Sequence, residues 1–349
     1  MLEVSCEILK PGMRLAKPVY NANGLLLMKD GETIYTQNID QLRTYEVEKI
    51  YIQWPNFESM EVVSVIKNET RQKAIQFVSE SLSNTYHSQI LEIDRIRKQV
   101  ETILHEILDH DDMLLNLTNL RAIDDYTFGH SVNVCVLSLI LGMTKGMSQD
   151  SLRELGIGAI VHDIGKLFVN QNALNKPGVL EPDEYEEMKK HATLGAALIR
   201  NIEELPENVL DIILYHHEWY NGAGYPNGLA GEEIPIMARI VAICDVYDAL
   251  TSDRVYKKKI SPQQALEYLV CMGDRQFDFG LLKQFIRHIR IYSSGMMVRL
   301  STGEEASVLA NNPSWPTRPV VQITADSAGR PVEEYQILDL SKKLSVEIL

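Results

Sequence analysis

The sequence predicts a mainly α-helical protein in which one large helical domain is flanked by a small β-rich module at each end. Three observations predict this fold class. Helix-like patterning runs almost unbroken through residues 122–290, short apolar runs separated by turn residues fill residues 1–64, and alternating segments fill residues 291–349. We take these ranges as domain boundaries and treat residues 65–121 as a separate helical segment.

Both terminal modules are expected to consist of short strands joined by turns. In the first module, Lys10-Pro11-Gly12, Asn23-Gly24 and Asp30-Gly31 separate short apolar runs, and such dipeptides mark turns. In the last module, the segments GMMVRLSTG and PVVQITAD alternate apolar and polar residues. A period of two is typical of a strand with one buried face.

Residues 65–121 contain neither Pro nor Gly, which predicts one long helix. Apolar residues recur along it at spacings of three and four, at Ile93, Ile96, Val100, Ile103 and Ile107. Such a stripe packs either on a second copy of the chain, as in a coiled coil, or on the chain's own domain. We predict a homodimer through this helix and keep packing on the chain's own domain as the alternative.

Composition excludes some functions and predicts a cytoplasmic location. The formal net charge of -14 argues against binding a nucleic acid polymer. The apolar run at residues 132–143 is too short to cross a bilayer, and the N-terminus lacks a signal-peptide layout, so we expect no membrane insertion. The four cysteines lie in apolar runs without CxxC spacing, which predicts buried thiols in a reducing compartment.

Histidines and aspartates concentrate in the helical domain, around the motifs HDIGK at 162–166 and HHEWYNGAGYP at 216–226. Imidazoles and carboxylates are ligands of transition metals, and this set is too large for one tetrahedral zinc. An aspartate beside a histidine can bridge two ions while the imidazole binds one of them. The sequence therefore predicts a centre of two divalent transition-metal ions, held by His130, His162, Asp163, His191, His216, His217 and Asp245.

Two such ions, about 3.5 to 4 Å apart, activate a water and stabilise both oxygens of a displacement at phosphorus. The ligands therefore predict phosphoester hydrolysis, with Asp163 and Lys166 as catalytic residues. Lys166 lies one turn beyond His162 and can place a positive charge on a phosphate oxygen. Arg254 and Lys257 could contact phosphate or guanine.

These motifs resemble the HD-GYP subgroup of the HD phosphohydrolase superfamily. HDIGK supplies the HD pair, and Gly224-Tyr225-Pro226 supplies the GYP. The likeness continues through the segments DDYTFGHSVNV, KPGVLEPDEY, HATLGAALI and EEIPIMARIVAICDVYDALTSDRVYK.

The resemblance implies an all-α domain with two or three iron or manganese ions, which hydrolyses the bacterial second messenger cyclic di-GMP to pGpG and often onward to GMP. It implies the same seven metal ligands. It also implies that five residues contact the nucleotide or shape its pocket: Lys166, Tyr225, Asp248, Arg254 and Lys257. The sequence does not identify a signalling partner such as a diguanylate cyclase.

Two alternatives stay open. The chain could be a cyclic di-GMP receptor or interaction module that signals through residues 65–121, although its intact ligand set favours an enzyme. It could also hydrolyse another cyclic dinucleotide, such as cyclic GMP-AMP, because two ions recognise the phosphodiester and not the base.

The number of metal ions is predicted from Tyr126. HD-GYP domains with a third ion carry a glutamate four residues before the first ligand histidine, whereas this chain has Tyr126 before His130. A phenol with a pKa near 10 stays protonated at pH 7 and is a poor ligand. We predict two ions per chain, and a third in Tyr126→Glu, by elemental analysis of protein purified without oxygen. Three fully occupied ions in the native protein would contradict this and would point to another carboxylate, such as Asp125.

Overall fold

The computed structural model describes residues 2–349 except 7–8, 10, 22–25, 46, 48, 54–64, 89–90, 110–114, 117–127, 175, 177, 179, 201, 203–204, 253–258, 293, 313–314 and 333–335. The chain divides into two compact units, which we describe separately. The helical unit comprises Val65–Leu115 and Asp125–His288, and the β-rich unit comprises Met1–Ser64, Asn116–Asp124 and Ile289–Leu349.

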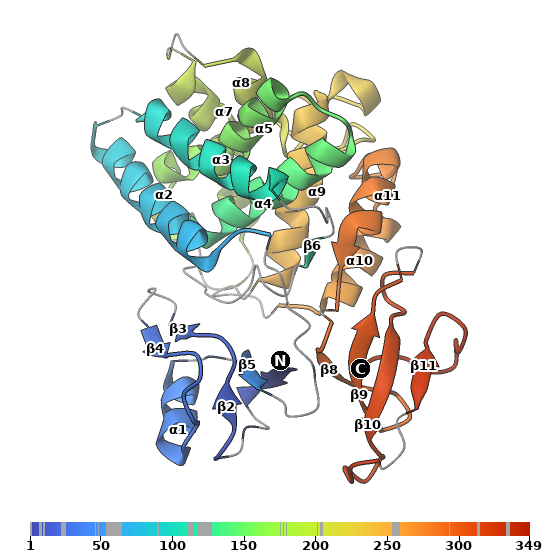
Figure 1. Cartoon of the computed structure of the whole chain (residues 1–349). Helices are drawn as coiled ribbons and strands as arrows, with labels where there is room; N and C mark the ends of the chain where they lie inside the picture. Colours follow the sequence, from blue (N-terminus) through green and yellow to red (C-terminus); the bar gives the residue numbers. More distant parts are fainter. Residues whose placement is uncertain are drawn as a thin grey trace. The chain divides into compact units, whose positions relative to one another are not determined.

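The helical unit is built around α4 (Phe128–Thr144), which packs against α2, α3, α5, α9 and α11 (Figure 1). Almost every residue of α4 is buried, which explains why its sequence is apolar all round. The other helices are α2 (Asn68–Ser88), α3 (Ile93–Leu108), α5 (Gln149–Val161), η3 (Ile164–Phe168), α6 (Gln171–Leu174), α7 (Pro182–Ile199), α8 (Glu207–Tyr215), η4 (Gly231–Glu233), α9 (Ile236–Thr251), α10 (Pro262–Cys271) and α11 (Phe279–His288).

Glycines allow neighbouring helices to approach closely. On α5, a Cβ at Gly156 would lie 2.5 Å from Val100 of α3, and one at Gly158 would lie 2.3 Å from Ile212 of α8. A third close approach joins η3 to α7, where a Cβ at Gly165 would lie 1.8 Å from the carbonyl oxygen of His191. The glycine of HDIGK therefore positions this motif against the helix that carries a further predicted ligand.

The prediction of one long helix over residues 65–121 was wrong. The described residues form two helices, α2 and α3, which pack on α4 and α5 within the helical unit. The apolar stripe is buried there, with Val100 and Ile103 fully buried. The stripe packs on the chain's own domain, which was the alternative. It is therefore not available as the dimer interface from which we predicted a homodimer.

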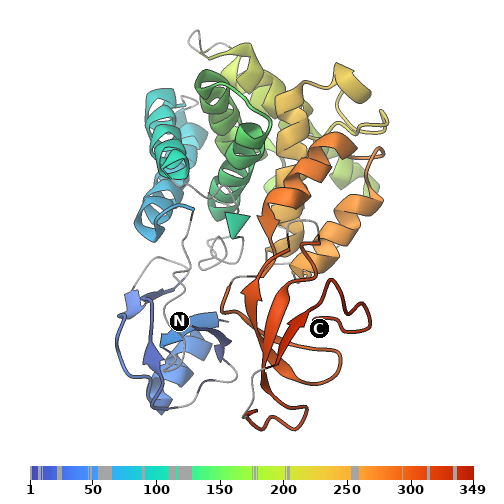
Figure 2. The same ribbon diagram turned by 45° about the vertical axis from the view of Figure 1, so that its right-hand side comes forward.

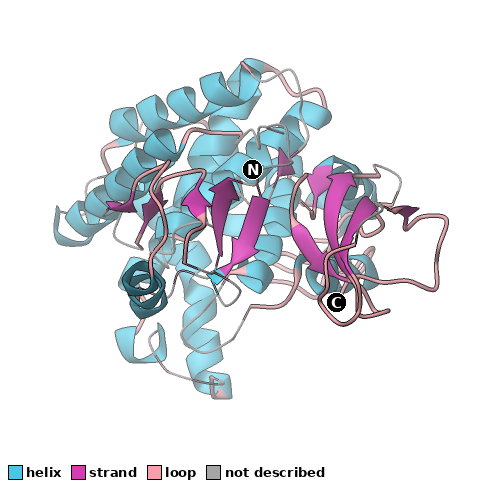
Figure 3. Cartoon of the chain, turned by 60° about the horizontal axis from the view of Figure 1, so that its bottom comes forward, coloured by secondary structure: helices cyan, strands magenta, loops and turns pink. Residues whose placement is uncertain are grey.

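Among its described residues, the β-rich unit contains antiparallel sheets of strand order β1-β5-β2 and β11-β10-β9-β8, together with the antiparallel pair β3-β4 (Figures 2 and 3). The first sheet, with α1, encloses a core that includes Leu15, Ile34 and Leu42, and Met297 of β8 packs against it. The two predicted modules are therefore β-rich, and they form one unit. The elements are β1 (Leu2–Ser5), β2 (Arg14–Leu15), β3 (Val19–Tyr20), β4 (Leu26–Met28), α1 (Thr36–Thr44), β5 (Lys49–Gln53), β6 (Leu115–Asn116), β7 (Ile289–Arg290), β8 (Met297–Arg299), β9 (Glu305–Ala310), β10 (Val320–Ala325) and β11 (Ile337–Asp339).

Three of the four cysteines are buried as predicted, namely Cys6, Cys135 and Cys244. The prediction was wrong for Cys271, which is exposed at the end of α10 because that helix buries its opposite face. In the part of the chain that the structure describes, no helix has both the length and the apolar character to cross a membrane.

We predict that Gly165→Ala lowers the free energy of unfolding by about 3 kcal/mol, the upper end of the usual cost of overpacking. The added Cβ would meet backbone atoms of His191 and Gly195, which cannot rotate away. Urea unfolding of the purified variant measures the effect. Gly280→Ala is the matched control, because its Cβ would meet only the Asp278 side chain, at 3.1 Å. Equal stability of both variants would show that η3 and α7 can separate without cost.

Candidate metal centre

The structure brings all seven predicted ligands together from five helices and the turns that follow them. His130 lies on α4, His191 on α7 and Asp245 on α9. The two adjacent pairs lie where helices end, since His162 caps α5 and His216 caps α8. The ligand atoms form two groups, within each of which they lie no more than 4.8 Å apart: His130, His162 and Asp245 in the first, and Asp163, His191, His216 and His217 in the second.

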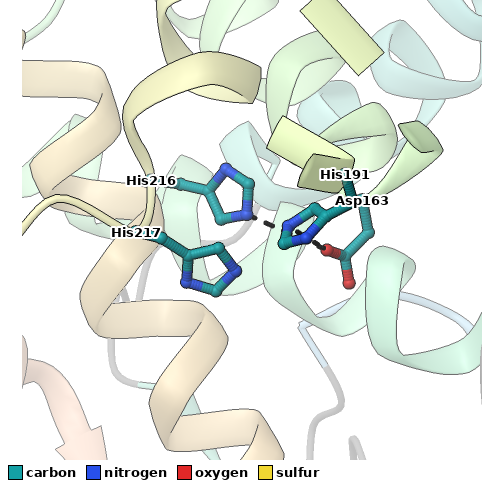
Figure 4. Close-up of side chains that lie close together, drawn as sticks. All are labelled: Asp163, His191, His216 and His217. Carbon is teal, nitrogen blue, oxygen red and sulfur yellow. Dashed lines mark ion pairs between the residues drawn. The ribbon is translucent and has the colours of Figure 1, made fainter. Parts of the chain in front are cut away.

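Asp163 faces both groups. Its Oδ1 lies 3.5 Å from His191 Nε2 and 3.8 Å from His216 Nε2, within the second group (Figure 4). Its Oδ2 lies 3.3 Å from Nε2 of His162, a member of the first group. One carboxylate therefore has an oxygen on each side, which is the geometry that a bridging ligand requires.

Hydrogen bonds at Nδ1 fix how the imidazoles point. Nδ1 of His162 lies 2.8 Å from the carbonyl oxygen of Ala159, and Nδ1 of His191 lies 2.6 Å from that of Met188. Nδ1 of His216 makes the same kind of contact within α8. A carbonyl only accepts, so each Nδ1 carries the proton and each Nε2 presents a lone pair to the centre.

The inward-facing atoms have no hydrogen-bond partner among the described residues. This holds for Nε2 of His130, His162, His191 and His216 and for Oδ1 of Asp163, all of them buried. Leaving buried acceptors unpaired and facing one another is costly. Divalent transition-metal ions would satisfy all of them, and imidazole nitrogen with carboxylate oxygen is the donor set that such ions take. The residues therefore fit the metal that the sequence predicts.

Electrostatics keeps Asp163 ionised and His191 neutral, the forms that bind cations. Burial alone would raise the pKa of Asp163, but Lys166 and His162 outweigh it and hold that pKa well below its usual value. Burial lowers the pKa of His191 to about 3, so its imidazole is neutral. His130 differs, because burial works against its protonation but the carboxylates of Asp245 and Asp248 outweigh burial and raise its pKa to about 9, so a metal ion would have to displace a proton from this imidazole.

Lys166 and Tyr225 lie at the edge of the ligand set. Lys166 Nζ is 2.5 Å from Asp163 Oδ2, and its side chain is partly exposed. The Tyr225 ring stacks on His217 at a centroid distance of 4.9 Å. Burial raises the pKa of Tyr225, so its hydroxyl remains a proton donor. Two more of the five predicted nucleotide contacts, Arg254 and Lys257, lie outside the described residues, as does Tyr126.

Asp248, which we predicted to contact the nucleotide or shape its pocket, lies behind one of the predicted ligands. Its carboxylate is buried behind His130, with Oδ2 2.7 Å from His130 Nδ1 and Oδ1 accepting a hydrogen bond from Asn133 Nδ2 at 2.9 Å. Both carboxylate oxygens of Asp248 therefore have hydrogen-bond partners inside the protein. Because α9 carries Asp245 and Asp248 one turn apart, one faces the centre and the other supports a ligand from behind.

The loop that contains GYP is held by Glu218, a residue whose role the sequence did not reveal. Its buried carboxylate accepts backbone N–H hydrogen bonds from Asn227, Gly228 and Leu229, at 2.7, 3.0 and 3.1 Å. Position 224 must be glycine because the backbone passes close to it there, and a Cβ would lie 2.2 Å from Trp219 N. These contacts fold the loop back on the turn that carries His217, and so place Tyr225 against that ligand.

We predict that Asp163→Asn lowers the metal content of the purified protein from two ions to one or fewer while leaving the helical content unchanged. The amide has no negative charge to share between two cations and offers only one oxygen. Elemental analysis and far-ultraviolet circular dichroism measure the two quantities. Asp150→Asn is a suitable control, because Asp150 lies in the first turn of α5 with an exposed side chain. A variant that retained two ions would exclude Asp163 as a bridge.

Two known families match the chain. Residues 105–281 match the HD domain, and residues 297–349 match a KOW domain associated with the HD domain. Among solved structures, Bd1817, an HDG"Y"P protein from Bdellovibrio bacteriovorus, superimposes with a TM-score of 0.52. That match covers 81% of this chain and 97% of the other at 17% identity, so it shows a shared fold.

Curated relatives are cyclic dinucleotide phosphodiesterases by name. The cyclic di-GMP phosphodiesterase PA4108 of Pseudomonas aeruginosa is 35% identical over 243 residues, 70% of this chain and 58% of the relative. The cyclic di-GMP phosphodiesterase response regulator RpfG of Xanthomonas campestris pv. campestris is 36% identical over 201 residues, 53% of each chain. The 3'3'-cGAMP-specific phosphodiesterase 2 of Vibrio cholerae is 32% identical over 179 residues, 51% of this chain and 34% of the relative.

The chain thus spans between about a third and three fifths of the length of these relatives. The HD domain match covers more than half of the chain and includes the HDIGK and GYP motifs and all seven ligands. The chain belongs to the HD domain family.

Proposed function

We propose that this protein is a metal-dependent phosphodiesterase that hydrolyses cyclic di-GMP and so lowers the level of this second messenger. One observation carries the proposal: the Asp163 carboxylate lies between two groups of imidazoles, and four of their Nε2 atoms are buried without a hydrogen-bond partner among the described residues. The names of the relatives support the substrate. We propose two ions, one in each group, with iron or manganese as the metal.

Ions bound there would supply Lewis acidity at the phosphodiester. They would also lower the pKa of a bound water, so that hydroxide would be available as the nucleophile at neutral pH. The chain supplies the rest. Lys166, held at Asp163 Oδ2, is close enough to the ligands to donate to a phosphate oxygen from the open side of the centre. Tyr225 packs on His217, which restricts the imidazole, and its protonated hydroxyl can donate to the same substrate.

Cyclic GMP-AMP is a second candidate substrate, because two relatives from Vibrio cholerae are named 3'3'-cGAMP-specific phosphodiesterases. The ligands recognise the phosphodiester, which both dinucleotides share. Selection of the second base would fall to residues away from the ions, and we propose Arg254 and Lys257 for this role. A cytoplasmic location follows from such a substrate and stays a prediction.

Turnover of purified protein tests the proposal. The protein is prepared without oxygen, its metal is quantified, and cyclic di-GMP and 3'3'-cGAMP are supplied separately while pGpG, GMP and the linear pGpA or pApG are resolved. We expect cyclic di-GMP to be cleaved faster, with pGpG accumulating first. A loaded protein that binds cyclic di-GMP but cleaves neither dinucleotide would be a receptor, and the enzyme proposal would be wrong. Faster cleavage of cGAMP would reassign the substrate.

We predict that Lys166→Ala slows turnover by roughly 10- to 1,000-fold, the range for losing one preorganised charge donor, without reducing metal content. Lys166→Arg should recover part of the rate, because it restores the charge with a different shape. Kinetics on metal-quantified samples measure both variants. Loss of metal in parallel with activity would mean that Lys166 supports Asp163 and does not act on substrate.

A further inference from the structure

We propose that Asn133 and Arg71 are positioning residues that orient His130 for metal binding through a buried chain of hydrogen bonds. This inference rests on the proposed two-ion centre. Neither residue is a predicted ligand, and Arg71 lies outside the residues that match the HD domain. Asn133 lies on α4, one turn after His130, and Arg71 lies on α2.

The chain runs from α2 through α4 and α9 to the centre. Arg71 Nη2 donates to Asn133 Oδ1 at 2.9 Å, and Asn133 Nδ2 donates to Asp248 Oδ1 at 2.9 Å. Asp248 Oδ2 lies 2.7 Å from His130 Nδ1. The exposed fractions of Arg71, Asn133 and Asp248 are 3%, 5% and 6%, so water cannot replace these partners easily.

The direction of every hydrogen bond follows from the arginine. A guanidinium can only donate, so the Asn133 side chain must turn its oxygen toward Arg71. Its amide nitrogen is then the atom that faces Asp248, and it can only donate. Asp248 therefore acts as an acceptor toward both neighbours. His130 must carry its proton on Nδ1, and this leaves Nε2 for a metal.

His130 needs this support more than three of the other ligands do. His162, His191 and His216 donate from Nδ1 to carbonyls of their own helices, which are fixed by the helix itself. The partner of His130 is a side chain, which could rotate. Asn133 restricts that rotation, because its Nδ2–H group holds Oδ1 of Asp248 at 2.9 Å.

Metal titration of variants tests the inference. In Asn133→Asp the new carboxylate still accepts from Arg71 but cannot donate to Asp248, so one ionised group opposes another. We expect Mn²⁺ to bind one of the two positions 10- to 100-fold more weakly, the usual effect of losing support behind a ligand. The other position, on the far side of Asp163, should keep its affinity. Isothermal titration of metal-depleted protein with Mn²⁺ resolves the two events.

Two substitutions at Arg71 provide an independent test should Asn133→Asp fail to fold. Arg71→Met removes the donor and should weaken the same single position. Arg71→Lys retains a group that can only donate and should restore most of the affinity. Thr85→Val is the control, since Thr85 is a buried residue of α2 that hydrogen-bonds within that helix to Ser81 O. It should alter stability and leave both affinities unchanged.

Three outcomes would overturn the inference. Wild-type affinity at both positions in Asn133→Asp and Arg71→Met would show that His130 is oriented without them. Equal weakening of both positions, without recovery in Arg71→Lys, would show a general packing role. Failure of the unaltered protein to bind any Mn²⁺ would refute the metal centre itself, and with it both the proposed function and this inference.

Discussion

The carboxylate of Asp163 is the group on which the arrangement of the candidate metal centre depends. One oxygen faces His162 and Lys166, and the other faces His191 and His216. Two cations could be held this close together only with negative charge between them, and burial would make that charge effective because little water screens it. The close contact of Gly165 with α7 exists at the same place and brings Asp163 within reach of His191.

The position of ligands at helix ends has a simple physical basis. The last carbonyls of a helix have no intrahelical partner. His162 and His216 cap α5 and α8, and each turns Nδ1–H back to a carbonyl of the last turn, at Ala159 and Ile213 respectively. One hydrogen bond therefore satisfies the helix end and directs Nε2 toward the centre. Adjacent pairs such as His162-Asp163 and His216-His217 can then aim at different ions, because the chain changes direction there.

Sequence reasoning selected the seven residues that the structure brings together, because imidazoles and carboxylates are rare in a core and their motifs are dense. It also predicted the helical domain and the β-rich ends, since periodicity of 3.6 or 2 is a local property. It failed where the answer depended on a partner distant in sequence. The stripe containing Val100 could not reveal whether its partner was a second chain or Gly156. Asp248 and Asn133 could not be assigned to His130 without knowing how α4 packs on α9, and nothing local indicated that Glu218 would hold the GYP loop.

Anomalous diffraction from crystals of manganese-loaded protein tests the central claim most directly. The account predicts two peaks on opposite sides of Asp163. One should lie within reach of His130, His162 and Asp245, the other within reach of His191, His216 and His217, with one Asp163 oxygen nearest each peak. A single peak, or two peaks of which only one has an Asp163 oxygen as a ligand, would contradict the bridging role from which the proposed chemistry is derived.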